Sequence, residues 1–283
     1  MEWQDGRESG DIEDRRGMGP VGVGGIGVGG VVLALIGYFV FGVSPQTTLR
    51  AVDQGGPAYE QPAGVRGRVS DEAGRFVDVI STNVDDVWTQ IFRQRGQTFR
   101  PPAAVVLYDQ ATGTGCGLGQ SAMGPFYCPQ DQKVYLDLSF WQELEGRFGA
   151  GGEAARAYVI AHEMGHHVQT LTGTSDQAQR LGAHGATSGS VRLELQADCY
   201  AGVWAAHAAE VSGGKVSLDP KDIEDGLRAA AAVGDDTLQQ KAQGRVMPDS
   251  FTHGTSAQRM RWFQRGEKSG DPDACDTFGA AGL

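Results

Sequence analysis

One short motif demands a particular local geometry: His162-Glu163-Met164-Gly165-His166 lies within the apolar stretch AYVIAHEMGHHVQTLTG. Two histidines four residues apart lie on one face of an α-helix, about one turn apart, so both imidazoles can reach one metal ion. Glu163, beside the first histidine, can then contact a water molecule on that ion. The alternative is an ordinary helix with charges on its wet face, but with 6 histidines in 283 residues a chance match is rare. The motif therefore predicts a helix that binds zinc.

A catalytic zinc site takes three protein ligands and leaves a fourth position for water. In metzincin peptidases the third ligand is a histidine six residues after the second, with a glycine midway. Here those places hold Thr172 and Gln169, so that pattern fails. Downstream, SVRLELQADCYAGVWAAHA reads as a helix with Glu194 and Asp198 one turn apart. We expect Glu194 to bind zinc and Asp198 to accept a hydrogen bond from the outer nitrogen of a ligand histidine.

Three of the four remaining histidines fit ordinary structural roles better than metal binding. On a helix His167 points about 100° away from His166, which favours a packing or surface position. His184 lies in a glycine-rich loop and His207 on an alanine-rich helix. We do not expect any of the three to bind metal.

A second feature concerns a membrane. Residues 20–43, PVGVGGIGVGGVVLALIGYFVFGV, contain no charge, and about 20 apolar residues in a helix cross a bilayer core. Arg15 and Arg16 precede this run and the next basic residue is Arg50. The positive-inside rule therefore predicts a single-pass cell-membrane protein, with a cytoplasmic tail at 1–19 and the rest of the chain outside the cytoplasm.

Two other interpretations of this run remain open. A cleaved signal peptide normally has a short basic start and an A-x-A site, whereas an acidic segment precedes this run. A buried helix of a soluble protein seldom extends so far without a charge. Gly25 and Gly29 form one GxxxG step through which two anchors could pair as a homodimer.

The rest of the chain reads as a linker at 44–69 and one folded domain at 70–283. Apolar residues at helical spacing predict one broken helix or two short ones from Ser70 to Gly96. A strand is expected at 103–108 and a hairpin at 125–128 and 133–138. Further helices are expected at 153–171, 191–210, 220–233 and 255–267. The predicted fold class is α+β, mainly helical with a small antiparallel sheet, preceded by one transmembrane helix.

Composition excludes some classes of protein. The formal net charge of −11 argues against nucleic acid as a partner, since binding it needs clustered cations. The four cysteines are too few for a small disulfide scaffold. Outside the cytoplasm they can form disulfides. Of the three possible connectivities, we favour Cys116–Cys128 and Cys199–Cys275.

His-Glu-Met-Gly-His with Glu194-Leu-Gln-Ala-Asp198 resembles the thermolysin-type, or gluzincin, arrangement. More closely, the chain resembles the bacterial "putative neutral zinc metallopeptidase" family, through segments that span nearly its whole length: EDRRG, the glycine-rich run, GPFYCPQDQKVYLD, HEMGHHVQ, ELQADCYAGVWA and FTHGTSAQR. The resemblance implies a membrane-anchored, zincin-like metallopeptidase.

The predicted activity is zinc-dependent hydrolysis of peptide bonds, with Glu163 as general base and a peptide or protein as substrate. His253 and Tyr200 are candidates for stabilising the oxyanion. The hairpin residues Phe126, Tyr127, Val134 and Tyr135 either pair with an extended substrate or simply pack in the core.

Two alternatives belong to other classes. One is a metal-stabilised binding or scaffold module without activity at the membrane. The other is an ion-transport component, which a single uncharged span makes a poor interpretation.

Overall fold

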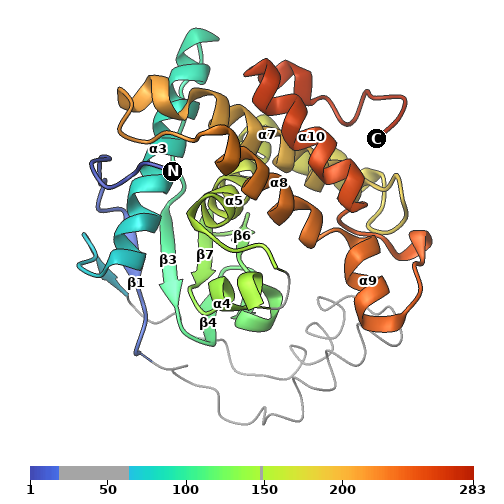
Figure 1. Cartoon of the computed structure of the whole chain (residues 1–283), viewed down its shortest axis with the longest axis horizontal. Coiled ribbons are helices and arrows are strands. Elements are labelled where there is room, and N and C mark those ends of the chain that lie inside the picture. Colours follow the sequence, from blue (N-terminus) through green and yellow to red (C-terminus); the bar gives the residue numbers. More distant parts are fainter. Residues whose placement is uncertain (19–63, 147–148) are drawn as a thin grey trace.

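The computed structural model describes residues 1–18, 64–146 and 149–283 (Figure 1). The predicted transmembrane helix at 20–43, with Gly25 and Gly29, and residues 44–63 of the predicted linker lie outside these described residues. Within them, no helix is both long and apolar enough to cross a membrane. The chain is α+β and mainly helical, as predicted. Its helices are α3 (Glu72–Gln94), α4 (Phe140–Gly146), α5 (Glu153–Thr172), α6 (Thr174–Arg180), α7 (Gly189–Ser212), α8 (Pro220–Ala232), α9 (Asp235–Gln243) and α10 (Ser256–Ser269).

The main sheet has five strands in the order β2-β1-β3-β7-β6. The strands are β1 (Ile12–Asp14), β2 (Val65–Arg66), β3 (Ala104–Tyr108), β6 (Phe126–Cys128) and β7 (Lys133–Asp137), and a separate hairpin pairs β4 (Ala111–Thr114) with β5 (Gly117–Gln120). The predicted hairpin is confirmed as the antiparallel pair β6–β7. The expectation of a purely antiparallel sheet is wrong, because β1, β3 and β7 run parallel to one another.

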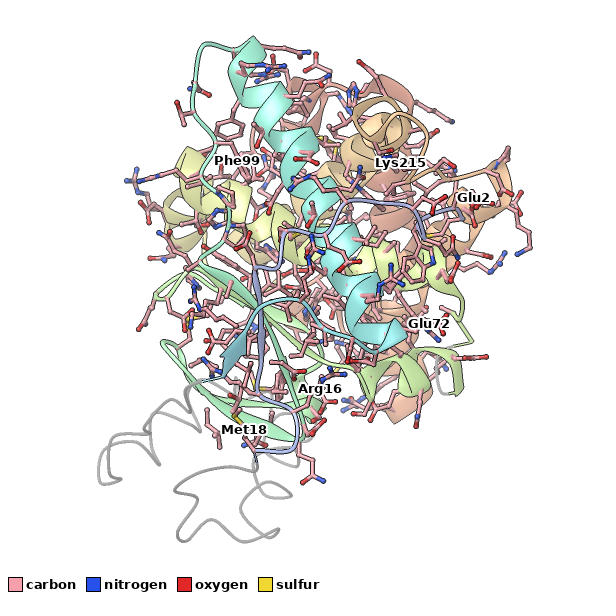
Figure 2. All side chains as sticks on the ribbon, turned by 90° about the vertical axis from the view of Figure 1, so that its left-hand side faces the viewer. Glu2, Arg16, Met18, Glu72, Phe99 and Lys215 are labelled. Carbon is pink, nitrogen blue, oxygen red and sulfur yellow. A yellow bond between two sulfur atoms is a disulfide. The ribbon has the colours of Figure 1, made fainter. Side chains whose placement is uncertain are left out.

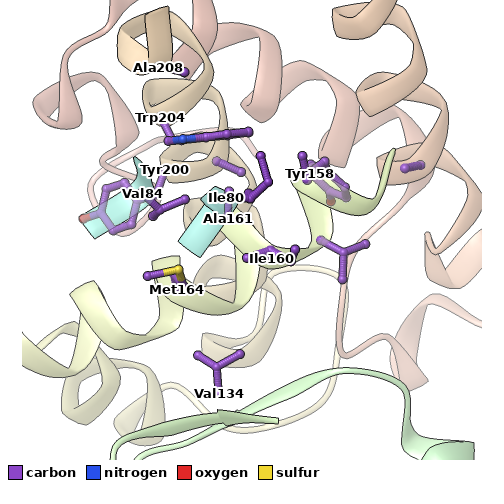
Figure 3. Packing of buried hydrophobic residues seen from close by; sticks show 14 of the residues in the cluster. Ile80, Val84, Val134, Tyr158, Ile160, Ala161, Met164, Tyr200, Trp204 and Ala208 are labelled. Carbon is purple, nitrogen blue, oxygen red and sulfur yellow. The ribbon is translucent and has the colours of Figure 1, made fainter. Parts of the chain in front are cut away.

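The sheet separates two apolar clusters because successive strand residues point to opposite faces. Val105 and Leu107 of β3 point into the main core, whereas Val106 and Tyr108 point into a small cluster on the other face. The main core lies between the sheet and helices α3, α5 and α7. Figure 3 shows this packing, with side chains from all three helices meeting above Val134 of β7.

The helices begin and end at the signals present in the sequence. α3 is one continuous helix, not a broken one, and the side chain of Asp71 caps its start by accepting a hydrogen bond from the Gly74 amide. α5 ends at Gly173 in the left-handed conformation. Capping boxes start α8 at Asp219 and α10 at Thr255.

Residues 1–18 differ most from prediction. We expected them in a tail separate from the domain, but β1 lies between β2 and β3 in the sheet. Trp3 is 2% exposed, packs edge-on against Phe76 and donates an indole hydrogen bond to Glu153. Figure 2 shows this segment running along α3 to Arg16. The prediction failed because the strand is three residues long, too short for a periodic pattern, in an otherwise acidic stretch.

Both disulfides that we favoured are present. Cys116–Cys128 ties the β4–β5 hairpin to the last strand of the main sheet, and Cys199–Cys275 ties the C-terminal segment to α7. No described cysteine is free. The second bridge closes the longer loop, 76 residues apart in sequence, so it removes more entropy from the unfolded chain.

The burial of Trp3 can be tested by unfolding. We expect Trp3→Ala in the full chain to lower the free energy of unfolding by about 3–5 kcal/mol, as for other buried aromatic residues. Asp5→Ala changes an exposed neighbour and should stay within about 0.5 kcal/mol of the parent. Chemical denaturation of the three proteins in one detergent provides the measurement. Equal stabilities would show that residues 1–18 do not belong to the core.

Candidate metal centre

His162 and His166 of α5 and Glu194 of α7 come together at one point. Their ligand atoms all lie within 4.8 Å of one another. The Glu194 carboxylate lies 3.2 Å from Nε2 of His162 and 3.5 Å from Nε2 of His166. Ligands about 2.1 Å from a tetrahedral zinc ion stand about 3.4 Å apart. These separations therefore suit one zinc ion, although Glu194 lies 28 residues beyond the second histidine.

A close approach of the two helices brings these residues together. Gly165 lies between the two histidine ligands, and a Cβ atom at this place would stand 3.3 Å from the Cα and carbonyl oxygen of Ala197. That separation is tighter than side chains normally accept. Ala197 in turn lies between Glu194 and Asp198. The small residues at this contact let α7 carry both acidic side chains up to the histidines.

The outer nitrogen of each histidine has its own hydrogen-bond partner. Nδ1 of His162 lies 2.9 Å from Asp198, and Nδ1 of His166 lies 2.8 Å from the side-chain oxygen of Gln169. The Gln169 amide group donates to the carbonyl of Leu193, which fixes its orientation. Both Nδ1 atoms therefore act as donors, and both Nε2 atoms keep a lone pair for a metal ion.

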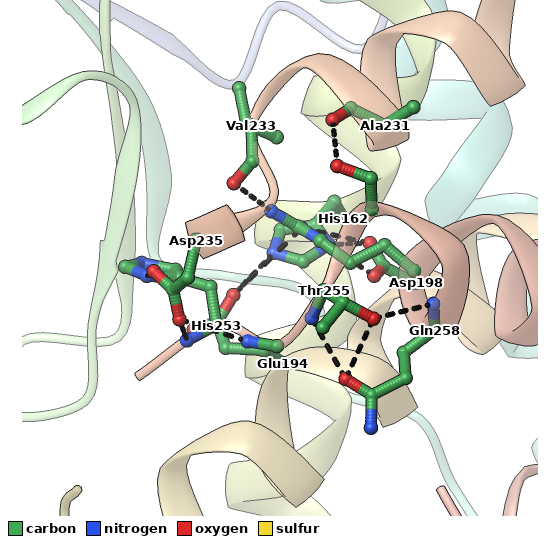
Figure 4. Close-up of polar contacts among 12 residues, drawn as sticks. His162, Glu194, Asp198, Ala231, Val233, Asp235, His253, Thr255 and Gln258 are labelled. Atoms are coloured by element: carbon green, nitrogen blue, oxygen red, sulfur yellow. Dashed lines mark hydrogen bonds and ion pairs between the residues drawn. The ribbon is translucent and has the colours of Figure 1, made fainter. Parts of the chain in front are cut away.

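Asp198 is held by more than the histidine. It is fully buried, and Arg259 of α10 donates to both of its oxygens at 2.8 and 2.9 Å, while the hydroxyl of Tyr158 donates a third hydrogen bond. α10 packs closely on α7, because a Cβ at Gly266 would overlap the carbonyl oxygen of Cys199. Figure 4 shows polar contacts around His162 and Asp198.

The charges of this group favour a bound cation. Burial alone would raise the pKa of Asp198, but Arg259 and His162 outweigh it and lower this pKa. Burial likewise opposes ionisation of Glu194, yet the neighbouring histidines, His166 foremost, lower its pKa well below the usual range. Both carboxylates are thus ionised. Burial works against protonation of His162, but Asp198 raises its pKa to about 10. A metal ion can take the place of that proton.

Glu163 lies beside these ligands and is 8% exposed. Burial, opposed by the charge of His162, raises the pKa of Glu163 to about 7. A carboxylate with a pKa near neutrality can both take and return a proton. Glu163 forms no hydrogen bond with another described side chain, so its oxygens are available to a substrate or water.

His253 lies at the rim of the same group, with 40% of its side chain exposed. Its ring lies 3.2 Å from Asp235, which also accepts hydrogen bonds from the backbone amides of Thr252, His253 and Gly254. Burial lowers the pKa of His253, but the charges of Glu194 and Asp235 outweigh it and raise this pKa. With Nδ1 turned to the hydroxyl of Thr252 at 2.8 Å and to Asp235 at 3.2 Å, Nε2 is the nitrogen left for a ligand (Figure 4).

Tyr200, the other candidate for the oxyanion, lies elsewhere. Its ring packs edge-on against Trp88 and lines a cavity with Gln196, Asp273 and Asp276. Six residues beyond Glu194 on the same helix, it points to a different face. Tyr200 is therefore not part of the site.

The other histidines lie outside the ligand group. His167 is buried, and its ring contacts the hydroxyl of Tyr127 and the carbonyl of Arg100. His207 contacts the carbonyl of Gly270. His184 lies in the segment between α6 and α7.

Four residues that support the site were not predicted from the sequence: Tyr158, Gln169, Asp235 and Arg259. Gln169 was noticed only as the residue that breaks the metzincin pattern. Its place one turn after His166 was the available signal, because residues three apart on a helix are neighbours. Arg259 and Asp235 lie far along the chain from the motif and give no comparable signal.

Comparison with known proteins agrees with this geometry. The family model described as "putative neutral zinc metallopeptidase" matches residues 1–278. The chain belongs to this family. It is 45% identical to the uncharacterised protein YpfJ of Escherichia coli K12 over 294 residues, covering 99% of each chain. It is 48% identical to the uncharacterised protein Rv2575 of Mycobacterium tuberculosis over 257 residues, covering 83% of this chain and 86% of the relative. No solved structure matches the chain.

The role of Asp198 can be measured through metal affinity. Asp198→Asn keeps the shape of the side chain but removes the charge that orients His162. We expect zinc affinity to fall about 10- to 100-fold. Competition with a fluorescent chelator measures it, and circular dichroism checks that the variant folds. Asp276→Asn, an exposed change, is the control, and unchanged affinity in a folded Asp198→Asn protein would refute the assignment.

Proposed function

We propose that the chain is a zinc-dependent endopeptidase. One observation carries the proposal: His162, His166 and Glu194 converge with Glu163 beside them, and among the described residues only these three group as metal ligands. Structural zinc sites are usually closed by four protein ligands, whereas catalytic sites have three and leave one position open. This arrangement favours catalysis over the alternative of a metal-stabilised module without activity.

The residues of the site have distinct roles in the proposed reaction. Zinc held by the three ligands would acidify a water molecule and polarise a peptide carbonyl. Glu163 takes the proton of the attacking water and passes it to the amine of the departing peptide. Asp198 and Gln169 keep the two histidines oriented throughout.

We assign stabilisation of the oxyanion to His253. Its ring lies at the rim of the site and is oriented by Asp235. The raised pKa of His253 favours the protonated form, which donates a hydrogen bond to a developing negative charge. Asp235 is then a positioning residue, because it acts through the histidine.

The peptide substrate is proposed to pair with β6. This strand ends the main sheet and pairs with β7 on one side only. It contacts α5 through the hydrogen bond from Tyr127 to His167, next to the metal ligand His166. Val134 and Tyr135 of the buried neighbouring strand cannot take this part. An extended peptide can add to such an edge by backbone hydrogen bonds.

We also propose that the protein acts at the cell membrane. The support is the uncharged run at 20–43, together with two disulfides, which form in oxidising compartments outside the cytoplasm. Pairing of two chains through Gly25 and Gly29 stays a prediction from the sequence.

The decisive experiment is the change Glu163→Gln. We expect the variant to bind one zinc per chain, as the parent does, and to lose casein hydrolysis by a factor of about 10²–10⁴, because the proton acceptor is gone. Metal analysis and a quenched-peptide assay on the full chain, with and without a chelator, give both readouts.

Glu72→Gln, an exposed change on α3, is the matched control and should leave both readouts unchanged. Zinc binding without hydrolysis in parent and variant alike would favour the inactive module. A Glu163→Gln variant as active as the parent would exclude Glu163 as the base.

A second experiment separates His253 from the metal ligands. We expect His253→Gln to lower kcat about 10²- to 10³-fold, as removal of an oxyanion donor does elsewhere, with zinc content unchanged. Asp235→Asn should lower kcat in the same direction and shift the pH profile of kcat, because it alters the pKa of His253. A loss of zinc in His253→Gln would instead identify a ligand.

A further inference from the structure

Residues 271–283 are fastened to helix α7, and we call them the C-terminal strap. Thr277 exchanges two hydrogen bonds with Arg192: its hydroxyl donates to the Arg192 carbonyl at 2.7 Å, and the Arg192 guanidinium donates to the Thr277 carbonyl. Two turns further along α7, the Cys199–Cys275 disulfide joins the helix to the strap. Cys199, Cys275 and Thr277 are all 0% exposed. The strap is therefore an integral part of the domain.

A third attachment lies between these two and leads to the metal site. The side-chain amide of Gln196 donates to the carbonyl of Cys275 at 3.1 Å, and the side-chain oxygen of Gln196 accepts from the amide of Gln169, also at 3.1 Å. The oxygen of Gln169 lies 2.8 Å from Nδ1 of the metal ligand His166. Gln169 is 0% exposed and Gln196 is 6% exposed. A continuous, buried chain of hydrogen bonds thus connects the strap to His166.

The strap sets the direction of the hydrogen bonds in this chain. A backbone carbonyl only accepts, so the carbonyl of Cys275 requires the amide group of Gln196, and not its oxygen, to face it. The oxygen of Gln196 is then left for the amide group of Gln169. Gln169 also donates to the carbonyl of Leu193, so both of its amide hydrogens are used and its oxygen faces His166. Nδ1 of His166 is therefore the donor, and the lone pair on Nε2 stays available to a metal ion.

Without the strap, nothing in this chain would hold the orientation of Gln196. If its side chain turned over, its amide group would face the amide group of Gln169, and the two donors would have no acceptor between them. An unpaired donor at a buried position costs free energy. Gln169 would avoid that cost by turning away, and its oxygen would then be lost to His166. The strap thus acts on the metal ligand through two glutamines.

We propose that the C-terminal strap positions His166 for metal binding, with Gln196 as the positioning residue and the Cys199–Cys275 disulfide holding the strap in place. The affinity for zinc then depends on a covalent bond between residues 76 positions apart. Disulfides form in oxidising compartments, so the chain acquires its full zinc affinity only there. This inference rests on the zinc binding of the proposed function, and not on the hydrolysis of peptides.

The zinc affinity of the full chain in detergent, measured by competition with a fluorescent chelator, tests the role of Gln196. Gln196→Met keeps the length of the side chain and removes both of its hydrogen bonds. We expect this change to lower the zinc affinity about tenfold, at the low end of the range for groups that orient a ligand, because Gln196 acts through Gln169. Gln94→Met, the same change at an exposed position, should leave the zinc affinity unchanged.

Replacing both cysteines of the bridge tests the disulfide. We expect Cys199→Ala with Cys275→Ala to lower the zinc affinity about tenfold as well. Adding Gln196→Met to this pair should lower it no further, because all three changes interrupt one chain of hydrogen bonds. Cys116→Ala with Cys128→Ala is the matched control. It removes a disulfide that joins other segments than α7, and the zinc affinity should stay that of the parent.

Two further readouts separate positioning from a general loss of stability. Circular dichroism of the metal-free proteins gives the melting temperature of each variant. A strap with only a structural role would lower this temperature and leave the zinc affinity of the folded protein unchanged. Cobalt(II) in place of zinc gives visible absorption that depends on the geometry of the ligands. We expect these bands to shift in Gln196→Met and to coincide with those of the parent in Gln94→Met.

The possible results distinguish this inference from the proposed function. Parent-like zinc affinity in folded Gln196→Met, or in the folded variant without Cys199 and Cys275, would overturn the inference. So would a combined loss equal to the product of the separate ones, about hundredfold, because the two parts would then act independently. If the parent binds zinc but does not hydrolyse casein, only the proposed activity fails, and the affinities still decide the role of the strap. A parent that binds no zinc would refute both.

Discussion

The site depends on how closely α5 and α7 approach one another. Gly165 faces Ala197 so closely that even a Cβ atom there would be tighter than side chains normally accept, and the metal ligands flank this contact. Wider spacing would carry Glu194 out of reach of the histidines, since a zinc–oxygen bond is only about 2.0–2.2 Å long. The glycine inside the motif thus has a packing role that the metal-binding pattern does not state.

A buried ion pair secures that approach. Asp198 and Arg259 are both fully buried, and such a pair is stable only if its hydrogen bonds are satisfied. Here the guanidinium bonds to both carboxylate oxygens and also to the carbonyl of Val233, so α10 and the end of α8 are fixed to the metal-binding helices. Removing one partner from a buried pair costs about 3–5 kcal/mol. The same network that orients His162 therefore also holds four helices together.

The features that could be predicted from the sequence are those whose signal is local. His162, His166 and Glu163 could be predicted because they lie close together in sequence at helical spacing. Strand β3 and the helices could be predicted because their apolar patterns are long enough to detect. The prediction of Glu194 and Asp198 also required the chemical expectation of a third zinc ligand. Arg259 and Asp235 were not predictable, since nothing local marks a residue whose partner lies 61 or 18 positions away. The parallel pairing of β1 with β3 was not predicted for the same reason: the two strands lie far apart in sequence, on either side of the long intervening segment.

The predicted orientation of the N-terminal segment shows how a local rule can mislead when the fold uses the same residues. Arg15 and Arg16 set the predicted orientation because they were counted as free cations beside an apolar run. In the structure, both are paired with carboxylates of the domain, and Arg15 is buried beneath the β4–β5 hairpin. Their charge is neutralised within the fold, and the strand next to them is held between β2 and β3. A topology that separates residues 1–18 from the domain would leave Glu13 and Lys133 without their pairing and would expose Ile12 and Trp3. The cost of that separation, in ion pairs and in buried apolar area, argues that residues 1–18 stay packed on the domain.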